Sequence, residues 1–145
     1  MEDKEELKGY MLKEIDLIQD IIKRMASNSF MLKGWTIALV VVTLLLKGTK
    51  DQIWIAFIPL LVFWFLDAYF LWQERMYRKL YEWVINNRLK TDEYLFDMNA
   101  YRFKDKVQSI PQIMFSITLG WFYGSIVILI IIYALILFLT TNGGG

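Results

Sequence analysis

One stretch of this sequence decides the fold: residues 53–72 read IWIAFIPLLVFWFLDAYFLW, twenty residues with a single charged side chain. A bilayer core of about 30 Å requires roughly twenty residues of α-helix, because each residue adds about 1.5 Å. Two further apolar stretches, residues 30–46 and 113–139, contain 17 and 27 residues and meet the same requirement. The chain is therefore expected to be an all-α membrane protein with three transmembrane helices.

The composition agrees with a membrane location and leaves few enzyme chemistries open. Hydrophobic residues make up 57% of the 145 residues, which exceeds what a soluble domain of this length can bury. The chain has no cysteine and no histidine, so it lacks thiolate nucleophiles and the most frequent zinc ligands and acid–base groups. The sequence also has no phosphate-binding loop, dinucleotide fingerprint or serine elbow. We expect a protein that is not an enzyme, with no catalytic residue, cofactor or metal site.

Basic residues are concentrated on one side of the predicted spans. Five precede Phe30 and eight lie within residues 73–112, whereas none follows Leu139. Because an excess of Lys and Arg marks cytoplasmic segments, the N-terminus and residues 73–112 are predicted to be cytosolic and the C-terminus to lie outside. Acidic residues are interleaved with the basic ones and the net charge is +1, so nucleic acid is not an expected partner.

Residues 1–29 are predicted to form a cytosolic amphipathic helix that continues into the first span. Apolar and small side chains recur there at intervals of four and three residues, at Met11, Ile15, Ile18, Ile22, Met25, Ser29 and Leu32. This period predicts one helix from about Glu5 to Leu46. The stripe is compatible with packing on a helix of the same chain or on another subunit. The charged character of this segment also argues against a cleaved signal peptide.

Residues 30–72 are predicted to form a transmembrane hairpin. Gly48 and Thr49 interrupt the helical pattern, and the second helix is expected to start near Gln52. Pro59 would then lie inside the second span and bend it.

Residues 73–112 are predicted to comprise a cytosolic helix and an interfacial segment. The helical stripe of the second span continues to about Asn87, so both hairpin helices should have long cytosolic extensions. Residues 92–109 mix aromatic and charged side chains, and they either lie along the membrane surface or fold as a loop against the cytosolic helices. Pro111 is expected to start the third helix, where its missing amide costs nothing.

The third span, residues 113–141, is predicted to carry a ridge of small side chains and to be followed by a flexible tail at residues 142–145. Ser116, Gly120 and Gly124 are four residues apart, a spacing that permits close helix approach. This ridge is expected to pack either on the hairpin of the same chain or on a second copy, which makes a homo-oligomer one expected state.

Lys33 and Asp67 are the charged residues within the predicted spans, and such residues are functional candidates by default. In a hairpin that turns about residue 50 they are equally far from the turn and share a depth. We expect an intramembrane ion pair near the cytosolic boundary that fixes the register of the hairpin, where snorkelling or water reduces the cost of burial. A proton or ion relay is the alternative.

Basic and aromatic side chains gather near the predicted ends of the spans. Arg75, Arg78 and Lys79 form a cytosolic basic face, which is typical of a positive-inside anchor and is also compatible with binding an anionic headgroup or a nucleotide phosphate. Aromatic residues at span ends are expected to be belt anchors in the interface; they are Trp54, Trp64, Trp72, Trp121, Tyr69 and Tyr123.

Part of the chain resembles known bacterial membrane proteins. The residues that carry this likeness are RMASNSFMLKGW at residues 24–35, Ile58-Pro59, Phe63-Trp64, residues 66–69 and residues 73–81. They resemble small uncharacterised bacterial membrane proteins, and the hairpin with long cytosolic helices is similar to the SLATT group of predicted effectors in conflict and anti-phage systems, although the third span departs from a two-span plan. The resemblance implies a bacterial inner membrane, a role in disrupting it or in anchoring a defence complex, and a shared pattern that includes Lys33 and Asp67.

Two functional hypotheses follow. In the first, the chain is an oligomeric effector whose cytosolic helices receive a signal or a protein partner and whose spans then disrupt the bilayer. In the second, it is a membrane anchor or scaffold that recruits a soluble enzyme. The outer halves of the spans contain no polar stripe, which argues against a constitutively open channel.

Overall fold

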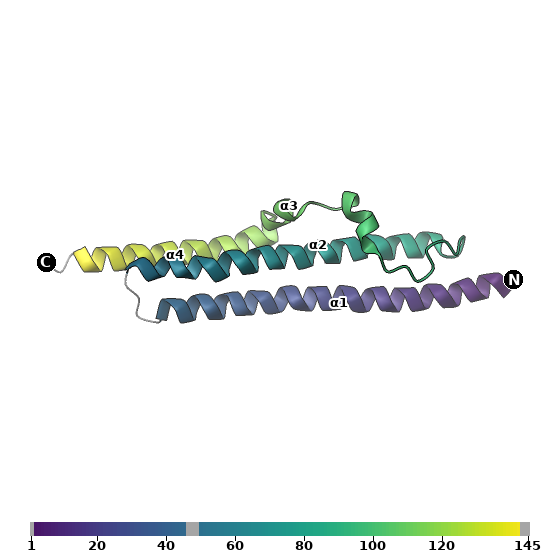
Figure 1. The fold of residues 1–145 in the computed structure, drawn as a ribbon, viewed down its shortest axis with the longest axis horizontal. Coiled ribbons are helices and arrows are strands. Elements are labelled where there is room, and N and C mark those ends of the chain that lie inside the picture. The colour runs from purple at the N-terminus through teal and green to yellow at the C-terminus, as the bar shows by residue number, and fades with distance from the viewer. Residues whose placement is uncertain (1, 46–49, 143–145) are drawn as a thin grey trace. The chain divides into compact units, whose positions relative to one another are not determined.

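A computed structural model describes the backbone of residues 2–45 and 50–142 and the side chains of residues 4–45 and 53–140. Within these ranges the regular structure is entirely helical (Figure 1). The elements are α1 (Glu2–Leu45), the 3₁₀ helix η1 (Lys50–Ala56), α2 (Phe57–Asn87), the 3₁₀ helix η2 (Ala100–Lys106), α3 (Ile110–Met114) and α4 (Ile117–Asn142). Three helical segments are long and apolar enough to cross a membrane, namely Lys4–Leu45, Ile53–Asn87 and Ile117–Thr140. The predicted all-α class with three candidate spans is confirmed.

The first helix is continuous through its amphipathic and apolar parts. Its observed bounds, Glu2–Leu45, are close to those predicted from the hydrophobic period. No proline interrupts it, and in lipid an unbroken helix is favoured because the backbone has no other hydrogen-bond partner. The predicted turn residues Gly48 and Thr49 lie outside the described residues.

The second span begins differently from the prediction. Instead of an α-helix from Gln52 with a bend at Pro59, the chain forms η1 first, and α2 begins at Phe57. Pro59 is the third residue of α2, where backbone N–H groups have no partner within the helix, so the missing amide removes no hydrogen bond. The helix then ends at Asn87, as its sequence predicts.

The third apolar stretch is broken, which corrects the predicted single helix over residues 113–141. α3 ends at Met114, and α4 begins at Ile117. Ser116 directly precedes α4, and its carbonyl oxygen accepts the amide hydrogen of Gly120 at an N···O distance of 2.7 Å. Serine is favoured immediately before a helix rather than within one, so a new helix starts at this point.

The two ends of this region agree only in part with the sequence prediction. Pro111 is the second residue of α3, in the first turn as expected. Asn142, which the sequence assigns to the flexible tail, is the last residue of α4. Residues 143–145, the rest of the predicted tail, lie outside the described residues.

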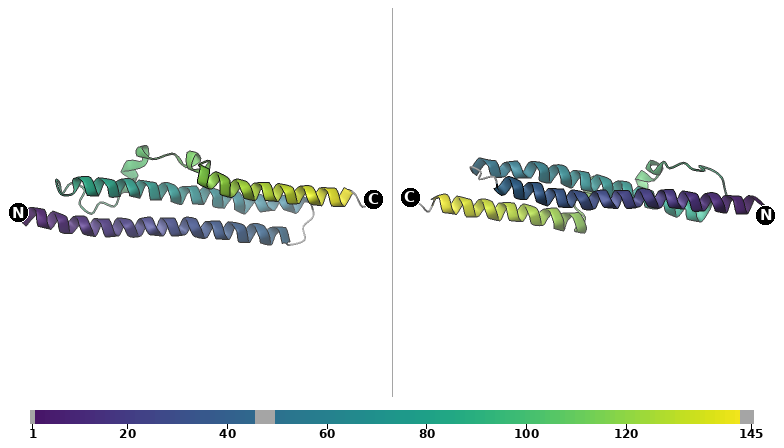
Figure 2. Two further views of the ribbon diagram at one scale, coloured as in Figure 1. Left: turned by 180° about the vertical axis from the view of Figure 1, so that it is seen from behind. Right: turned by 90° about the horizontal axis from the view of Figure 1, so that it is seen from below.

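The chain divides into two compact units. Unit 1 comprises residues 1–28 and 69–109, and unit 2 comprises residues 29–68 and 110–145. Within unit 1 the N-terminal part of α1 lies beside the C-terminal part of α2 in both views of Figure 2. The boundaries of the units fall within α1 and α2, so each of these helices contributes residues to both units.

Unit 1 has a hydrophobic core of its own, formed by Ile18, Met76, Leu80, Val84, Ala100 and Phe103. Ile18 belongs to the stripe predicted on α1, so this part of the stripe packs within the same chain. Ala100 and Phe103 come from η2 and are buried. The segment at residues 92–109 thus folds against the helices of unit 1 at these two side chains, as the loop alternative requires.

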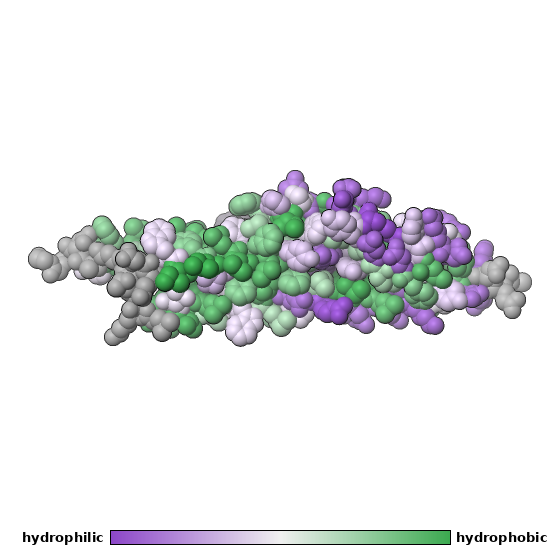
Figure 3. Space-filling view, in the orientation of Figure 1, coloured by the Kyte–Doolittle hydropathy of each residue, from purple (hydrophilic) through white to green (hydrophobic). Residues whose placement is uncertain are grey.

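Unit 2 buries few of its apolar side chains and exposes many. The side chains of Phe30, Ile117 and Trp121 are each more than three-quarters exposed, at 78%, 82% and 78%. Figure 3 shows apolar side chains gathered over α4. A continuous apolar surface of this kind is suited to lipid and not to water.

Candidate functional site

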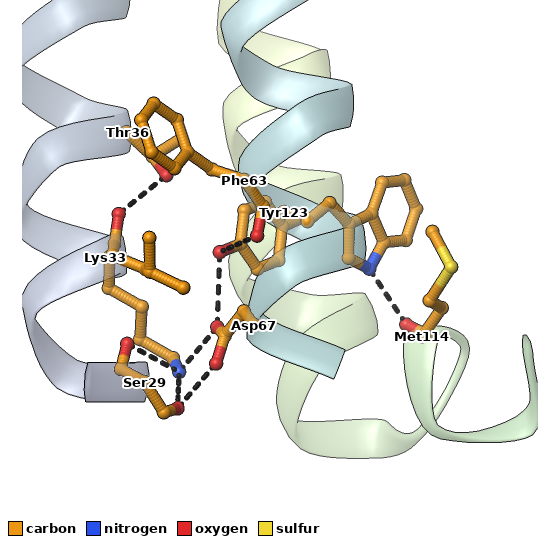
Figure 4. A network of polar contacts seen from close by, with 9 residues as sticks. Ser29, Lys33, Thr36, Phe63, Asp67, Met114 and Tyr123 are labelled. Carbon is orange, nitrogen blue, oxygen red and sulfur yellow. Dashed lines mark hydrogen bonds and ion pairs between the residues drawn. The ribbon is translucent and has the colours of Figure 1, made fainter. Parts of the chain in front are cut away.

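Asp67 is the centre of a polar network within unit 2. It lies on α2 and its side chain is fully buried. Lys33 of α1 places Nζ 2.6 Å from Oδ2 of Asp67, and Tyr123 of α4 donates its hydroxyl hydrogen to the same oxygen at 3.0 Å. The hydroxyl of Ser29 donates to the other oxygen, Oδ1 (Figure 4). Both oxygens of the carboxylate are therefore bound, by three side chains from two other helices.

The local helix geometry positions these partners. Ser29 and Lys33 are four residues apart on α1 and so share a face, and Lys33 Nζ also donates to Ser29 Oγ at 2.9 Å. Tyr123 donates to the carbonyl oxygen of Phe63 as well, at 3.3 Å. Its ring stacks on that of Trp64, with centroids 5.5 Å apart and planes 7° apart. The hydroxyl of Tyr123 is thus held by ring packing as well as by hydrogen bonds.

The described partners of Asp67 are an ammonium group and two hydroxyl groups, which stabilise its negative charge. Lys33 and Asp67 are the charged residues of unit 2 within residues 29–45, 53–68 and 110–140. Besides Asp67, the hydroxyl of Tyr123 has the carbonyl oxygen of Phe63 and the side chain of Thr36 as partners. No group of residues in the described part of the chain has the composition of a metal site. These contacts support a structural role of the ion pair, and the relay stays a prediction.

The sequence predicted the contact between Lys33 and Asp67 but not its two hydroxyl partners. Ser29 was visible only as a small residue on the α1 stripe. The prediction that Tyr123 is a belt anchor is wrong, because Tyr123 is fully buried. Trp64 is partly buried and donates its indole hydrogen to the carbonyl of Met114 at 2.9 Å. No local sequence pattern predicts the contact of Tyr123 with Asp67, because it depends on how α4 packs on α2.

The three residues of the predicted ridge, Ser116, Gly120 and Gly124, line one surface groove. Ser116 directly precedes α4, and the two glycines lie within it. A side chain at Gly120 would meet only the backbone of Phe115, at 3.8 Å, and one at Gly124 would meet nothing within 4 Å. Trp121 and Ile128 also line this groove. Neither glycine therefore seats another described helix of the same chain.

The predicted basic face is largely neutralised on α2 itself. Arg78 binds Glu74, with N···O distances of 2.8 and 2.7 Å, and Lys79 binds Glu82 at 2.8 Å. Arg75 differs, because it donates to the side-chain oxygen of Gln108. The three residues thus do not act as one free cationic surface.

A second buried ion pair lies in unit 1, and sequence reasoning missed it. Arg88 is fully buried, and its Nε and Nη2 lie 2.5 and 2.9 Å from the two carboxylate oxygens of Glu14. The remaining guanidinium hydrogens are donated to the carbonyl oxygens of Thr91, Glu93 and Tyr94, at 2.8 to 3.1 Å. Glu14 also accepts the amide hydrogen of Phe96 at 2.8 Å.

This ion pair holds the loop that follows α2. Tyr94 and Phe96 have φ values of 56° and 55°, a left-handed conformation that costs non-glycine residues roughly 1–2 kcal/mol each. Bonds from Arg88 and Glu14 to the loop backbone offset this cost. Glu14 lies on the apolar face of α1, between Met11 and Ile18, and this position was the available signal for a buried partner.

Comparison of the chain with protein families, with curated proteins and with solved structures gives no match.

Proposed function

We propose that the chain is a non-enzymatic, oligomeric effector of the bacterial inner membrane, which disrupts membrane integrity in defence when its cytosolic face receives a signal. The observation that carries this proposal is the uncovered glycine groove on α4. Gly120 and Gly124 lie in a candidate span and no other described helix of the chain packs on them. Small residues in a span permit close helix contact, so a second copy of α4 is the proposed occupant.

The proposed topology is a transmembrane hairpin of α1 and α2 with long cytosolic extensions. Two contacts support it, because Glu14 meets Arg88 in one unit and Lys33 meets Asp67 in the other, as antiparallel helices require. The excess of basic residues before Phe30 and within residues 73–112 supports a cytosolic location of these segments. The C-terminus is then outside.

The role proposed for Lys33 and Asp67 is to fix the register of the hairpin. A buried pair specifies one alignment, since a slipped alignment leaves an unpaired charge in an apolar environment. Ser29 and Tyr123 also favour the observed alignment, because only in this alignment do they donate hydrogen bonds to Asp67.

The alternative function is a scaffold that recruits a soluble protein. Unit 1 carries exposed apolar side chains at Leu12, Leu17, Ile85 and Leu89. Exposed apolar surface on a cytosolic segment is typical of protein docking, and this observation favours a protein partner for unit 1.

The test combines oligomer size with membrane integrity. The size of the purified chain is measured in detergent by light scattering, and dye uptake is measured in cells that express it. We expect the wild-type chain to be oligomeric and, when it is overexpressed, to admit dye, whereas Gly120→Leu and Gly124→Leu should lose both properties. Gly34→Leu is the matched control, because Gly34 is also a glycine in a candidate span with open space around its Cβ position, and it should behave as wild type.

The two hypotheses predict different results. Equal oligomer size in all four proteins would remove the glycine groove from the mechanism. Intact membranes with the wild-type chain, with and without its cytosolic partner, would exclude the effector and leave the scaffold.

A further inference from the structure

An aromatic and basic cluster lies in unit 1. The rings of Trp72 and Tyr101 meet edge to face, with centroids 5.8 Å apart. The ammonium group of Lys104 lies 5.1 Å from the centre of the Tyr101 ring. Arg75, three residues beyond Trp72 on α2, donates to the side-chain oxygen of Gln108. These five residues are called the Trp72 cluster below.

The cations of the Trp72 cluster lack the carboxylate partners that their neighbours have. Arg78 and Lys79 each bind a glutamate of α2. The salt bridges within the described part of the chain include neither Arg75 nor Lys104, and none of them involves Asp105, the acidic residue next to Lys104. The cluster therefore presents positive charge that is available to an external anion.

The place of the cluster in the chain indicates the source of that anion. Trp72 is the last residue of the second apolar stretch, and Gln108 lies two residues before the start of α3. Aromatic side chains favour the headgroup level of a bilayer, and cations there attract anionic lipids. Tyr101 is 54% exposed, so its ring is not simply part of the core.

We infer that the Trp72 cluster binds the phosphate group of an anionic phospholipid. Arg75 and Lys104 supply the charge, and the amide group of Gln108 supplies a neutral donor. The rings of Trp72 and Tyr101 contact the apolar part of the lipid next to its headgroup. The inference rests on the proposed location of residues 73–112 beside the inner leaflet, and it is independent of oligomer formation and of membrane disruption.

The test is native mass spectrometry of the full chain in detergent, with phosphatidylglycerol or phosphatidylcholine added at equal concentration. We expect the wild-type chain to retain phosphatidylglycerol in preference. The double variant Arg75→Gln with Lys104→Gln should bind this lipid about tenfold more weakly, because two cations near an anionic headgroup are lost. The control is Arg78→Gln with Lys79→Gln, which removes the same charge from neighbouring positions and should retain wild-type binding.

Three outcomes would overturn the inference. The first is equal retention of both lipids by the wild-type chain, and the second is an equal loss of phosphatidylglycerol binding in the two double variants. The third is displacement of phosphatidylglycerol by millimolar inorganic phosphate, which would assign the site to a soluble phosphate. Arg75→Lys changes the side chain but keeps its positive charge, so it should keep most of the lipid binding. This variant therefore distinguishes a loss of binding caused by unfolding from one caused by the missing charge. Lipid binding and dye uptake are separate measurements, so either the lipid-binding inference or the proposed effector function can be contradicted without the other.

Discussion

Each unit has one buried ion pair between α1 and a later residue, Asp67 of α2 in unit 2 and Arg88, directly after α2, in unit 1. The remaining hydrogen bonds of the two pairs go to different kinds of partner. In unit 1, Arg88 and Glu14 bind backbone groups of the loop at residues 91–96. In unit 2, Asp67 binds Lys33 and two side-chain hydroxyl groups.

The difference follows from what the surroundings offer. A loop has backbone N–H and C=O groups that no helix uses, and the planar guanidinium group has five donors with which to bind several carbonyls. Within a membrane span the backbone groups are already paired along the helices, so a buried carboxylate can be satisfied only by side chains. Hydroxyl groups are therefore the partners to expect around a buried charge in a span.

The largest expected effect is that of Glu14→Ala. It leaves Arg88 fully buried without its carboxylate and removes the acceptor of the Phe96 amide, so the free energy of unfolding should fall by about 4 kcal/mol. Reversible unfolding in mild detergent measures this loss, and hydrogen exchange should increase within residues 88–98. Asp16→Ala is the control, because this carboxylate is exposed on the same helix. A loss below about 1 kcal/mol would mean that Arg88 is solvated without Glu14.

A smaller loss, about 2–3 kcal/mol, is expected for Asp67→Asn, because Lys33 retains 23% exposure of its side chain and can reach water or headgroups. The same unfolding measurement applies. Exchange of the charges, Lys33→Asp with Asp67→Lys, should recover part of the stability lost in the single variants. No recovery would contradict a direct energetic coupling of the two charges.

The hydroxyl partners are tested by Tyr123→Phe. The ring can still stack on Trp64, but the hydrogen bond to Asp67 is lost, at an expected cost of about 1.5 kcal/mol for a charged acceptor. Tyr133→Phe is the matched control, because the hydroxyl of Tyr133 donates to the neutral carbonyl of Leu44 at 3.2 Å. Equal losses in the two variants would show that the charge of Asp67 adds nothing to the bond.

The smallest effect is expected for Arg78→Gln. This side chain is 60% exposed in its salt bridge with Glu74, and exposed pairs one helical turn apart contribute only about 0.3–0.5 kcal/mol. Thermal unfolding should be nearly unchanged. A loss comparable to that of Asp67→Asn would mean that burial does not set the strength of these ion pairs.

The contact between Lys33 and Asp67 was predictable because both residues are equally far from residue 50, where the apolar pattern is interrupted. Glu14 and Arg88 nearly satisfy the same condition. The sequence does not indicate this pair, because Arg88 follows the end of α2 and is one of eight basic residues within residues 73–112. Its burial depends on how the following loop folds back, which the helical period does not describe.

By itself, the sequence determined the helical class, the three candidate spans and the end of α2, because hydropathy and helical period are properties of neighbouring residues. Only the tertiary structure decided that Tyr123 binds Asp67 and that the glycines of α4 are left uncovered, because both depend on contacts, made or absent, between residues far apart in the chain. The break at Ser116 is local: it depends on the backbone hydrogen bonds of residues 111–120, which hydropathy does not describe.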